Sequence, residues 1–223
     1  MKNRLHGKKA GIIIWMGNEP FPNAANTSLL EFDGCPKPAY YEMKRAFAPV
    51  MLGLRHDSVV AKEGKVTVKP FLRADGRALP LCCDDATLRV YDLTGTLVAE
   101  HSLPATTAAC DFAAVEIPVE TTVLARLESK AQGICVEYIF FPENEHPFSP
   151  LLERAAACVE VTAENDRITL VNRGESVALY CDVTAYTEDG QIVCAADGNL
   201  CLLPGESRSY AAPGAVRAAI SAL

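Results

Sequence analysis

The sequence lacks most of the features that mark a protein of nucleic acids, membranes or metals. Its 223 residues contain 21 Lys and Arg against 28 Asp and Glu, and the formal net charge is −7. The basic residues are scattered, which argues against nucleic acid and against an anionic membrane surface as partners. No apolar run approaches the roughly 20 residues that cross a bilayer, and the first ten residues lack the apolar core of a signal peptide. Soluble partners or neutral substrates fit this composition better.

Cysteine and histidine are present, but not in metal-binding patterns. The four histidines stand alone in sequence, and the cysteines form no Cys-x-x-Cys pair. Most cysteines lie inside apolar, strand-like runs, where a thiol behaves as a small buried hydrophobe. We therefore expect no metal, no cofactor and reduced thiols in a cytoplasmic protein. The nine cysteines are Cys35, Cys82, Cys83, Cys110, Cys135, Cys158, Cys181, Cys194 and Cys201.

An apolar run near the start predicts a buried strand. Residues 11–16 (Gly-Ile-Ile-Ile-Trp-Met) are β-branched and aromatic almost without interruption, as in strands of parallel sheets and α/β barrels. Asn18 and Glu19 follow at once, at the carboxyl end of the strand, where a barrel presents side chains to substrate.

A helix is predicted next. Residues 37–48 have an amphipathic pattern, Pro38 suits the first turn, and Pro49 ends the helix. We interpret Tyr40, Tyr41 and Phe47 as packing residues of this helix.

From residue 51 onward, turn signals and period-two alternation predict β-sandwiches. We divide the chain into residues 1–50, a first immunoglobulin-like sandwich (51–142), an extended, proline-rich linker (143–150) and a second sandwich (151–223). The fold class is therefore mainly β, with a short α/β segment in front. The predicted strands are 57–61, 65–74, 87–93, 96–102, 110–117, 122–129 and 133–141 in the first sandwich, and 158–164, 167–172, 178–186, 199–202, 206–211 and 216–222 in the second.

Two stretches resemble one enzyme family. Trp15-Met-Gly-Asn-Glu-Pro-Phe-Pro22, followed by the helix Lys37-Pro-Ala-Tyr-Tyr-Glu-Met-Lys-Arg-Ala-Phe-Ala-Pro49, resembles the last strand and helix of the catalytic barrel in family 2 glycoside hydrolases, especially the β-mannosidase branch. Met16, Gly17 and Glu19 differ from the residues that are usual at these positions of the family. Far downstream, Asp197-Gly-Asn-Leu-Cys-Leu-Leu-Pro-Gly-Glu206 is similar to a motif in the terminal sandwich of the same branch.

The resemblance implies retaining hydrolysis of glycosidic bonds by two carboxyl groups about 5 to 5.5 Å apart. In the family these lie on the fourth and seventh barrel strands, and a whole barrel needs about 250 residues. This chain holds only the last βα unit, so we expect it to lack the catalytic pair. The acidic turns around Asp84-Asp85 and Glu143-Asn-Glu145 are interpreted as solvated turns.

The resemblance also suggests substrate contacts. Trp15 matches a tryptophan that forms the floor of the sugar site, and Asn18 and Glu19 match an Asn-Asp pair that bonds sugar hydroxyls or holds neighbouring loops. The plainer alternatives stay open: Trp15 as a core aromatic and Asn18 as a turn former.

Two functional hypotheses follow. In the first, the chain is the carboxyl-terminal part of a longer β-mannosidase-like enzyme, the parent enzyme, whose substrate is a carbohydrate. The chain alone would then be catalytically inactive. In the second, it is a non-catalytic sandwich that binds carbohydrate or protein, a hypothesis weakened by its single tryptophan. An isolated parallel strand leaves its edges unpaired, so residues 1–50 should pack on the first sandwich, pair with another copy of the chain, or be covered by the missing barrel of a longer polypeptide.

Overall fold

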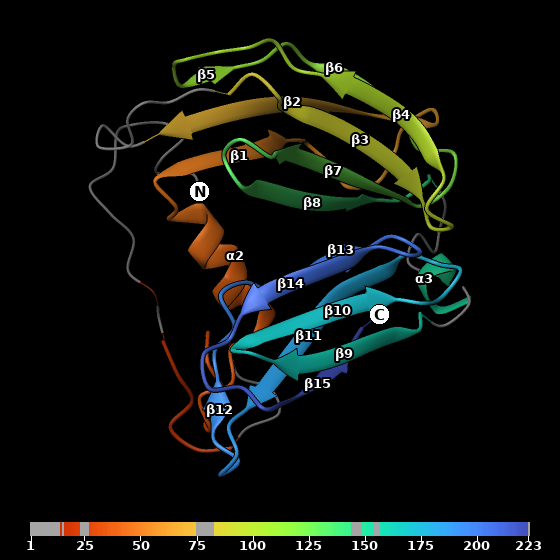
Figure 1. Ribbon diagram of the computed structural model, residues 1–223. Coiled ribbons are helices and arrows are strands. Elements are labelled where there is room, and N and C mark those ends of the chain that lie inside the picture. Colours follow the sequence, from red (N-terminus) through yellow and green to blue (C-terminus); the bar gives the residue numbers. More distant parts are fainter. Residues whose placement is uncertain are drawn as a thin grey trace. The chain divides into compact units, whose positions relative to one another are not determined.

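A computed structural model describes residues 14, 16–22, 27–74, 83–143, 149–153 and 157–222. The chain forms two compact units (Figure 1). The central unit comprises residues 47–155, and the terminal unit combines residues 1–46 with residues 156–223. The terminal unit is thus built from both ends of the sequence, with the central unit inserted between them.

The central unit is a sandwich of two antiparallel sheets. Its long strand β2 pairs with β1 along one edge, and with β6 and then β5 along the other. The second sheet has the order β4-β3-β7-β8. The strands of the first sheet are β1 (Val50–Arg55), β2 (Lys65–Ala74), β5 (Cys110–Asp111) and β6 (Val115–Pro118), and those of the second are β3 (Thr87–Asp92), β4 (Leu97–Ser102), β7 (Val123–Ser129) and β8 (Ile134–Phe140).

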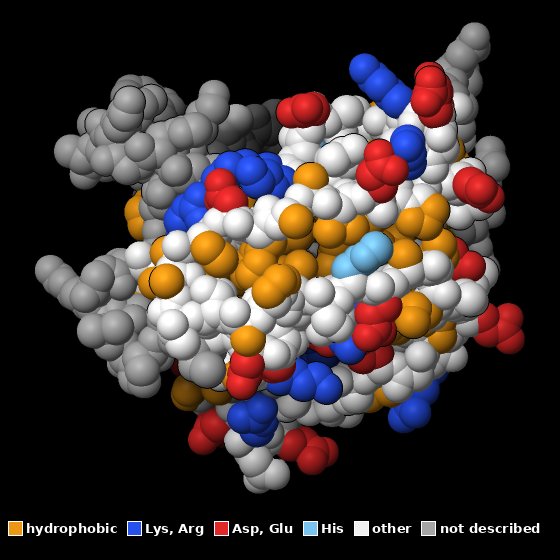
Figure 2. All heavy atoms as spheres, turned by 90° about the horizontal axis from the view of Figure 1, so that it is seen from above, with side chains coloured by type: hydrophobic (Ala, Val, Ile, Leu, Met, Phe, Trp, Pro, Cys, Tyr) orange, Lys and Arg blue, Asp and Glu red, His pale blue; other side chains and the backbone are white. Residues whose placement is uncertain are grey.

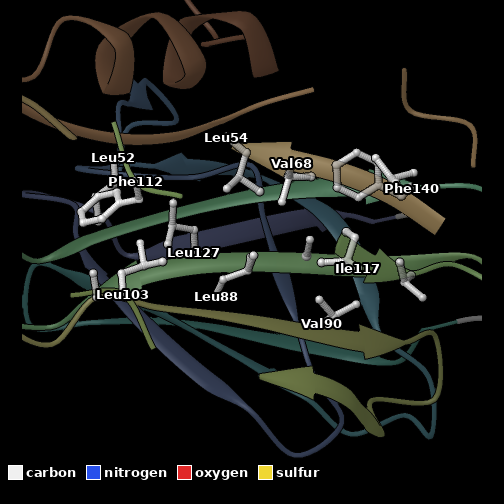
Figure 3. Close-up of a cluster of buried hydrophobic side chains, with 14 of the residues drawn as sticks. Leu52, Leu54, Val68, Leu88, Val90, Leu103, Phe112, Ile117, Leu127 and Phe140 are labelled. Atoms are coloured by element: carbon white, nitrogen blue, oxygen red, sulfur yellow. The ribbon is translucent and has the colours of Figure 1, made fainter. Parts of the chain in front are cut away.

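The core of the central unit forms where the inner faces of these two sheets meet. Over residues 65–70 of β2, alternate residues are buried, as a strand with one face on a core requires. Figure 3 shows Leu52, Leu54 and Val68 of the first sheet in one cluster with Leu88 and Leu127 of the second. All five side chains are at most 3% exposed, so the hydrophobic effect holds the two sheets together.

The terminal unit contains the second sandwich. One sheet has the order β14-β10-β9, and in the other β11 pairs with β12, β13 and β15. Ile168 and Leu170 of β10 meet Val183 and Ala185 of β11 in its core. The strands are β9 (Val159–Glu164), β10 (Arg167–Asn172), β11 (Ala178–Tyr186), β12 (Ile192–Val193), β13 (Leu200–Leu202), β14 (Ser207–Ala211) and β15 (Arg217–Ser221).

Helix α2 (Pro38–Ala46) also belongs to the terminal unit. It begins at Pro38, carries Lys44 and Arg45 in its last turn, where cations complement the helix dipole, and ends before Pro49. The expectation that residues 1–50 pack on the first sandwich is wrong for the described residues up to Ala46, which belong to the terminal unit. Residues 47–50 do belong to the central unit, where Val50 begins β1.

The mainly β fold with two sandwiches is confirmed, and β2, β10 and β11 have the predicted bounds. Several details differ. The predicted strand at 57–61 is reduced to an isolated bridge at Val60, and β1 forms at 50–55 instead. The strand predicted at 110–117 is split into β5 and β6, and the short β12 was not predicted. In the predicted linker, Ser149 and Pro150 begin helix α3 (Ser149–Glu153).

Most of the predicted strand at 11–16 lies outside the described residues. Ile14 and Met16, which are described, are not in a strand, and Met16 has the left-handed φ of 65°. Phe47 is 56% exposed, so its assignment as a packing residue of the helix is wrong, whereas Tyr41 is 1% exposed, as expected of one.

Candidate functional site

The loop that follows the predicted strand is held by backbone hydrogen bonds. Asn18 forms a parallel bridge with Leu30. The Gly17 carbonyl accepts from the amides of Leu29 and Leu30 at 3.2 and 3.0 Å, and the Glu19 amide donates to Leu30 at 3.2 Å. The Asn18 side chain is exposed. These backbone bonds hold residues 17–19 in place, and the Nδ2 atom of the exposed Asn18 side chain donates a long bond of 3.5 Å to the Glu19 carbonyl.

The Glu19 side chain is buried. It is 3% exposed and forms an ion pair with the ammonium group of Lys37, just before helix α2. Ser28 Oγ lies 3.3 Å from Glu19 Oε1 and donates to the Leu30 carbonyl at 2.9 Å. A buried carboxylate needs such partners, because leaving one unpaired is costly. Glu19 thus fastens the loop to the start of the helix.

Helix α2 is bound to the second sandwich by the loop at residues 196–199. Tyr41 packs against Gly198, Arg45 Nη2 bonds Asp197 Oδ1 at 2.8 Å, and the same nitrogen bonds the Gly198 carbonyl. Lys44 donates to the Ala196 carbonyl. The helix motif and the Asp197 motif, which carried the family resemblance, are therefore in direct contact. The sequence contained both motifs but gave no signal that they meet.

A second contact lies on the outer face of β11. Cys35 Sγ is 3.5 Å from Thr184 Oγ1. Burial raises the pKa of the Cys35 thiol and of the Asp182 carboxyl, and the nearby Glu31 carboxylate raises the pKa of Asp182 further. Burial also raises the pKa of the Tyr41 phenol far above its usual range.

Trp15, the predicted sugar platform, lies outside the described residues, and so does Glu145. Of the other acids considered above, Asp84 is exposed, whereas Asp85 and Glu143 accept hydrogen bonds. Ser129 Oγ donates to Asp85 and lowers the pKa of that carboxyl, and the Ala131 amide donates to it at 2.9 Å. Glu143 accepts a bond from the Glu63 amide at 3.1 Å. These contacts give the carboxylates structural roles.

One open cavity of about 350 Å³ lies in the central unit. Asp57, Lys62, Glu63 and Lys65 line it together with Ser58 and Thr67. The two acidic and two basic side chains in this lining cancel in net charge, and none of the residues that line the cavity is an aromatic that could stack on a sugar ring. Figure 2 likewise shows acidic and basic side chains intermixed on the face it presents. Among the described residues, no three His, Cys, Asp or Glu side chains gather into a metal-binding group.

In the part of the chain that the structure describes, no helix is both long and apolar enough to cross a bilayer. Eight cysteines in the described ranges are not part of a disulfide.

Solved structures of two glycosidases share this fold. The exo-β-D-glucosaminidase CsxA, studied with a glucosamine-configured castanospermine and an amino-australine analogue, matches 95% of this chain with a TM-score of 0.62 and 20% identity. The β-D-mannosidase from Dictyoglomus thermophilum matches 93% with a TM-score of 0.54 and 16% identity. The chain spans 30% and 25% of those two chains. No family model matches the sequence, and no curated protein matches it either.

Proposed function

We propose that this chain is the carboxyl-terminal part of a β-mannosidase-like glycoside hydrolase, and that it is catalytically silent by itself. Its two sandwiches brace a catalytic barrel, and the segment that ends in helix α2 is the last βα unit of that barrel. The parent enzyme hydrolyses O-glycosidic bonds with retention. The barrel, or another copy of the chain, covers residues 1–50.

The observation that carries this proposal is the contact between the two motifs. Arg45 and Asp197 are 152 positions apart, yet they bond at 2.8 Å. Each motif resembles the same enzyme branch on its own, and a chance match would give no reason for them to touch. The fold shared with two glycosidases over 93% and 95% of the chain supports the same origin.

We further propose different tasks for the three site residues. Trp15 supplies the floor of the sugar site in the parent enzyme, and the accessible Asn18 amide bonds a sugar hydroxyl. Glu19 acts one step away from the sugar, because its carboxylate is occupied by Lys37 and Ser28. It holds the loop that presents Asn18. Cysteines that form no disulfide in the described ranges fit a reducing, cytoplasmic location.

The alternative function, a non-catalytic module that binds carbohydrate, has less support. A sugar-binding sandwich presents aromatic side chains on a sheet face or its loops. Among the described residues, the strongly exposed phenylalanines are Phe21, Phe32 and Phe47, and none of them belongs to a strand of either sandwich.

Two measurements test the proposal. The chain is incubated with nitrophenyl β-mannoside and β-glucosaminide, and it is titrated with mannose and manno-oligosaccharides by calorimetry. We expect no turnover, and turnover would contradict the proposal. Binding of free sugar without turnover would favour the module instead.

The coding sequence upstream of Met1 gives the second test. We expect about 200 further residues of alternating strands and helices, with glutamates at the ends of the fourth and seventh strands. If the gene instead has an in-frame stop codon directly upstream of Met1, the barrel is not encoded in the same polypeptide. The barrel would then have to be a separate polypeptide, and failure to find one that co-purifies would refute the proposal.

A further inference from the structure

On the outer face of β11, where the amino-terminal segment covers it, the Asp182 carboxyl lies among side chains that do not stabilise its negative charge. Val183 and Ala185 point into the core of the sandwich, so Asp182 and Thr184 lie on the opposite face. Thr184 contacts Cys35. Asp182 is therefore in the layer between the sheet and residues 31–41.

The Asp182 carboxyl is half-buried and only partly satisfied in this layer, where the Val183 amide donates a hydrogen bond to it. Its Oδ1 atom is buried and has no hydrogen-bond partner. The charged or titratable groups that face it are the Glu31 carboxylate, the Cys35 thiol and the Tyr41 phenol, and none of them is a cation. An ionised carboxylate here is partly desolvated and is repelled by Glu31, whereas a protonated one is neutral and can donate a hydrogen bond.

We propose that Asp182 is a proton-dependent latch that controls how tightly residues 27–46 pack on the second sandwich. Protonation of Asp182 closes the latch, and ionisation loosens it. The segment under its control carries helix α2 and lies next to the loop of Asn18 and Glu19. The latch does not depend on the proposed enzymatic origin of the chain.

The direction of the effect follows from linkage. Burial and Glu31 raise the pKa of Asp182 in the packed state above its ordinary value of about 3.9. Between these two pKa values, the packed state binds more protons than the released state. Packing therefore weakens as the pH rises through this window, and it stays at its weaker level above the raised pKa.

Hydrogen exchange measured by mass spectrometry tests the latch on the whole chain. Exchange of residues 27–46 is followed at about pH 4.5 and about pH 7.5, corrected for intrinsic chemical exchange, with the core strand β10 as internal reference. The expected protection of residues 27–46 in the wild type falls at least about threefold over this range, while β10 changes less.

Three variants assign the effect. In Asp182→Asn the fall in protection should disappear, and protection at about pH 7.5 should equal or exceed that of the wild type. Glu31→Gln removes the repulsion but keeps the titrating group, so it should increase protection at about pH 7.5 and retain a pH dependence. Glu188→Gln, an exposed acid on the same sandwich, should behave as the wild type.

A wild-type protection that does not change with pH would overturn the proposal. So would an Asp182→Asn variant that retains the wild-type pH dependence. If Asp182→Asn fails to fold, Glu31→Gln decides: unchanged protection at about pH 7.5 refutes the latch.

Discussion

Tyr41 lies so close to Gly198 that no side chain fits between them. A Cβ atom added to Gly198 would be 2.9 Å from both Cε2 and Cζ of the Tyr41 ring, which is 1% exposed. The ring cannot retreat because it is buried. Glycine at position 198 is thus what lets helix α2 approach the second sandwich.

Gly198→Ala should destabilise the chain by about 1–3 kcal/mol, because the added methyl group overpacks a buried contact. Gly17→Ala is the matched control, since a Cβ there meets nothing within 4 Å. Urea unfolding followed by circular dichroism measures both. Equal losses in the two variants would mean that the Tyr41 contact does not decide the stability.

The buried pair of Glu19 and Lys37 gives a second prediction. Glu19→Gln should cost about 2–4 kcal/mol of unfolding free energy, because it removes the carboxylate that pairs with the Lys37 ammonium in a largely buried site. The double variant Glu19→Gln with Lys37→Met should recover part of the loss. A double-mutant cycle with no coupling energy would show that the pair does not hold the loop.

The ion pairs of Asp111 lead us to predict that acid lowers the stability of the central unit. Arg73 and Arg55 bond its carboxylate at 2.6 and 2.9 Å. The hydrogen bond from Arg73, helped by that from Arg55, lowers the pKa of Asp111. The unfolded chain therefore binds protons more readily, so the stabilisation is complete above the ordinary pKa of about 3.9 and is lost as the pH falls through the lowered pKa.

Asp111→Asn should flatten the acid limb of the stability curve. Thermal unfolding of wild type and variant between about pH 6 and pH 2 measures this difference. The exposed Glu188→Gln serves as control. A variant whose melting temperature falls with acid as steeply as that of the wild type would contradict the prediction.

We predict that the stability of the second sandwich depends strongly on the Asn172 side chain. Its fully buried amide donates to the carbonyls of Ser176 and Leu202 at 2.8 and 2.9 Å and accepts from the Gly174 amide at 2.9 Å. Asn172→Ala should cost about 2–4 kcal/mol, since several buried backbone groups lose their partners at once. A loss below about 1 kcal/mol in urea unfolding would show that water replaces the amide.

Strands with clean alternation were predictable from the sequence. Hydrophobic and polar residues alternate over residues 65–70 of β2 and 167–170 of β10, and the bounds of both strands match the prediction. The sequence does not predict β1, because Gly53 interrupts an apolar run that follows the helix directly. Its glycine serves a contact that no local pattern reveals: a Cβ at Gly53 would lie 2.5 Å from Phe71 Cζ.

The candidate site was predictable only in part. The resemblance singled out Asn18 and Glu19, but the burial of Glu19 depends on Lys37 and Ser28, which no periodicity connects to it. The contact of Arg45 with Asp197 is equally remote in sequence. Local patterns record which face of an element is apolar, whereas such pairings arise only when distant segments fold together.

The insertion of the central unit between the two parts of the terminal unit determines the order of events on the ribosome. Helix α2 leaves the exit tunnel long before the loop that binds it, since Arg45 and Asp197 are 152 positions apart. At about 5–20 residues per second, translation separates them by roughly 8–30 s. During that interval Tyr41 has no Gly198 to pack against, so nascent chains are exposed to aggregation in this period, and a slow codon run before residue 197 would lengthen it.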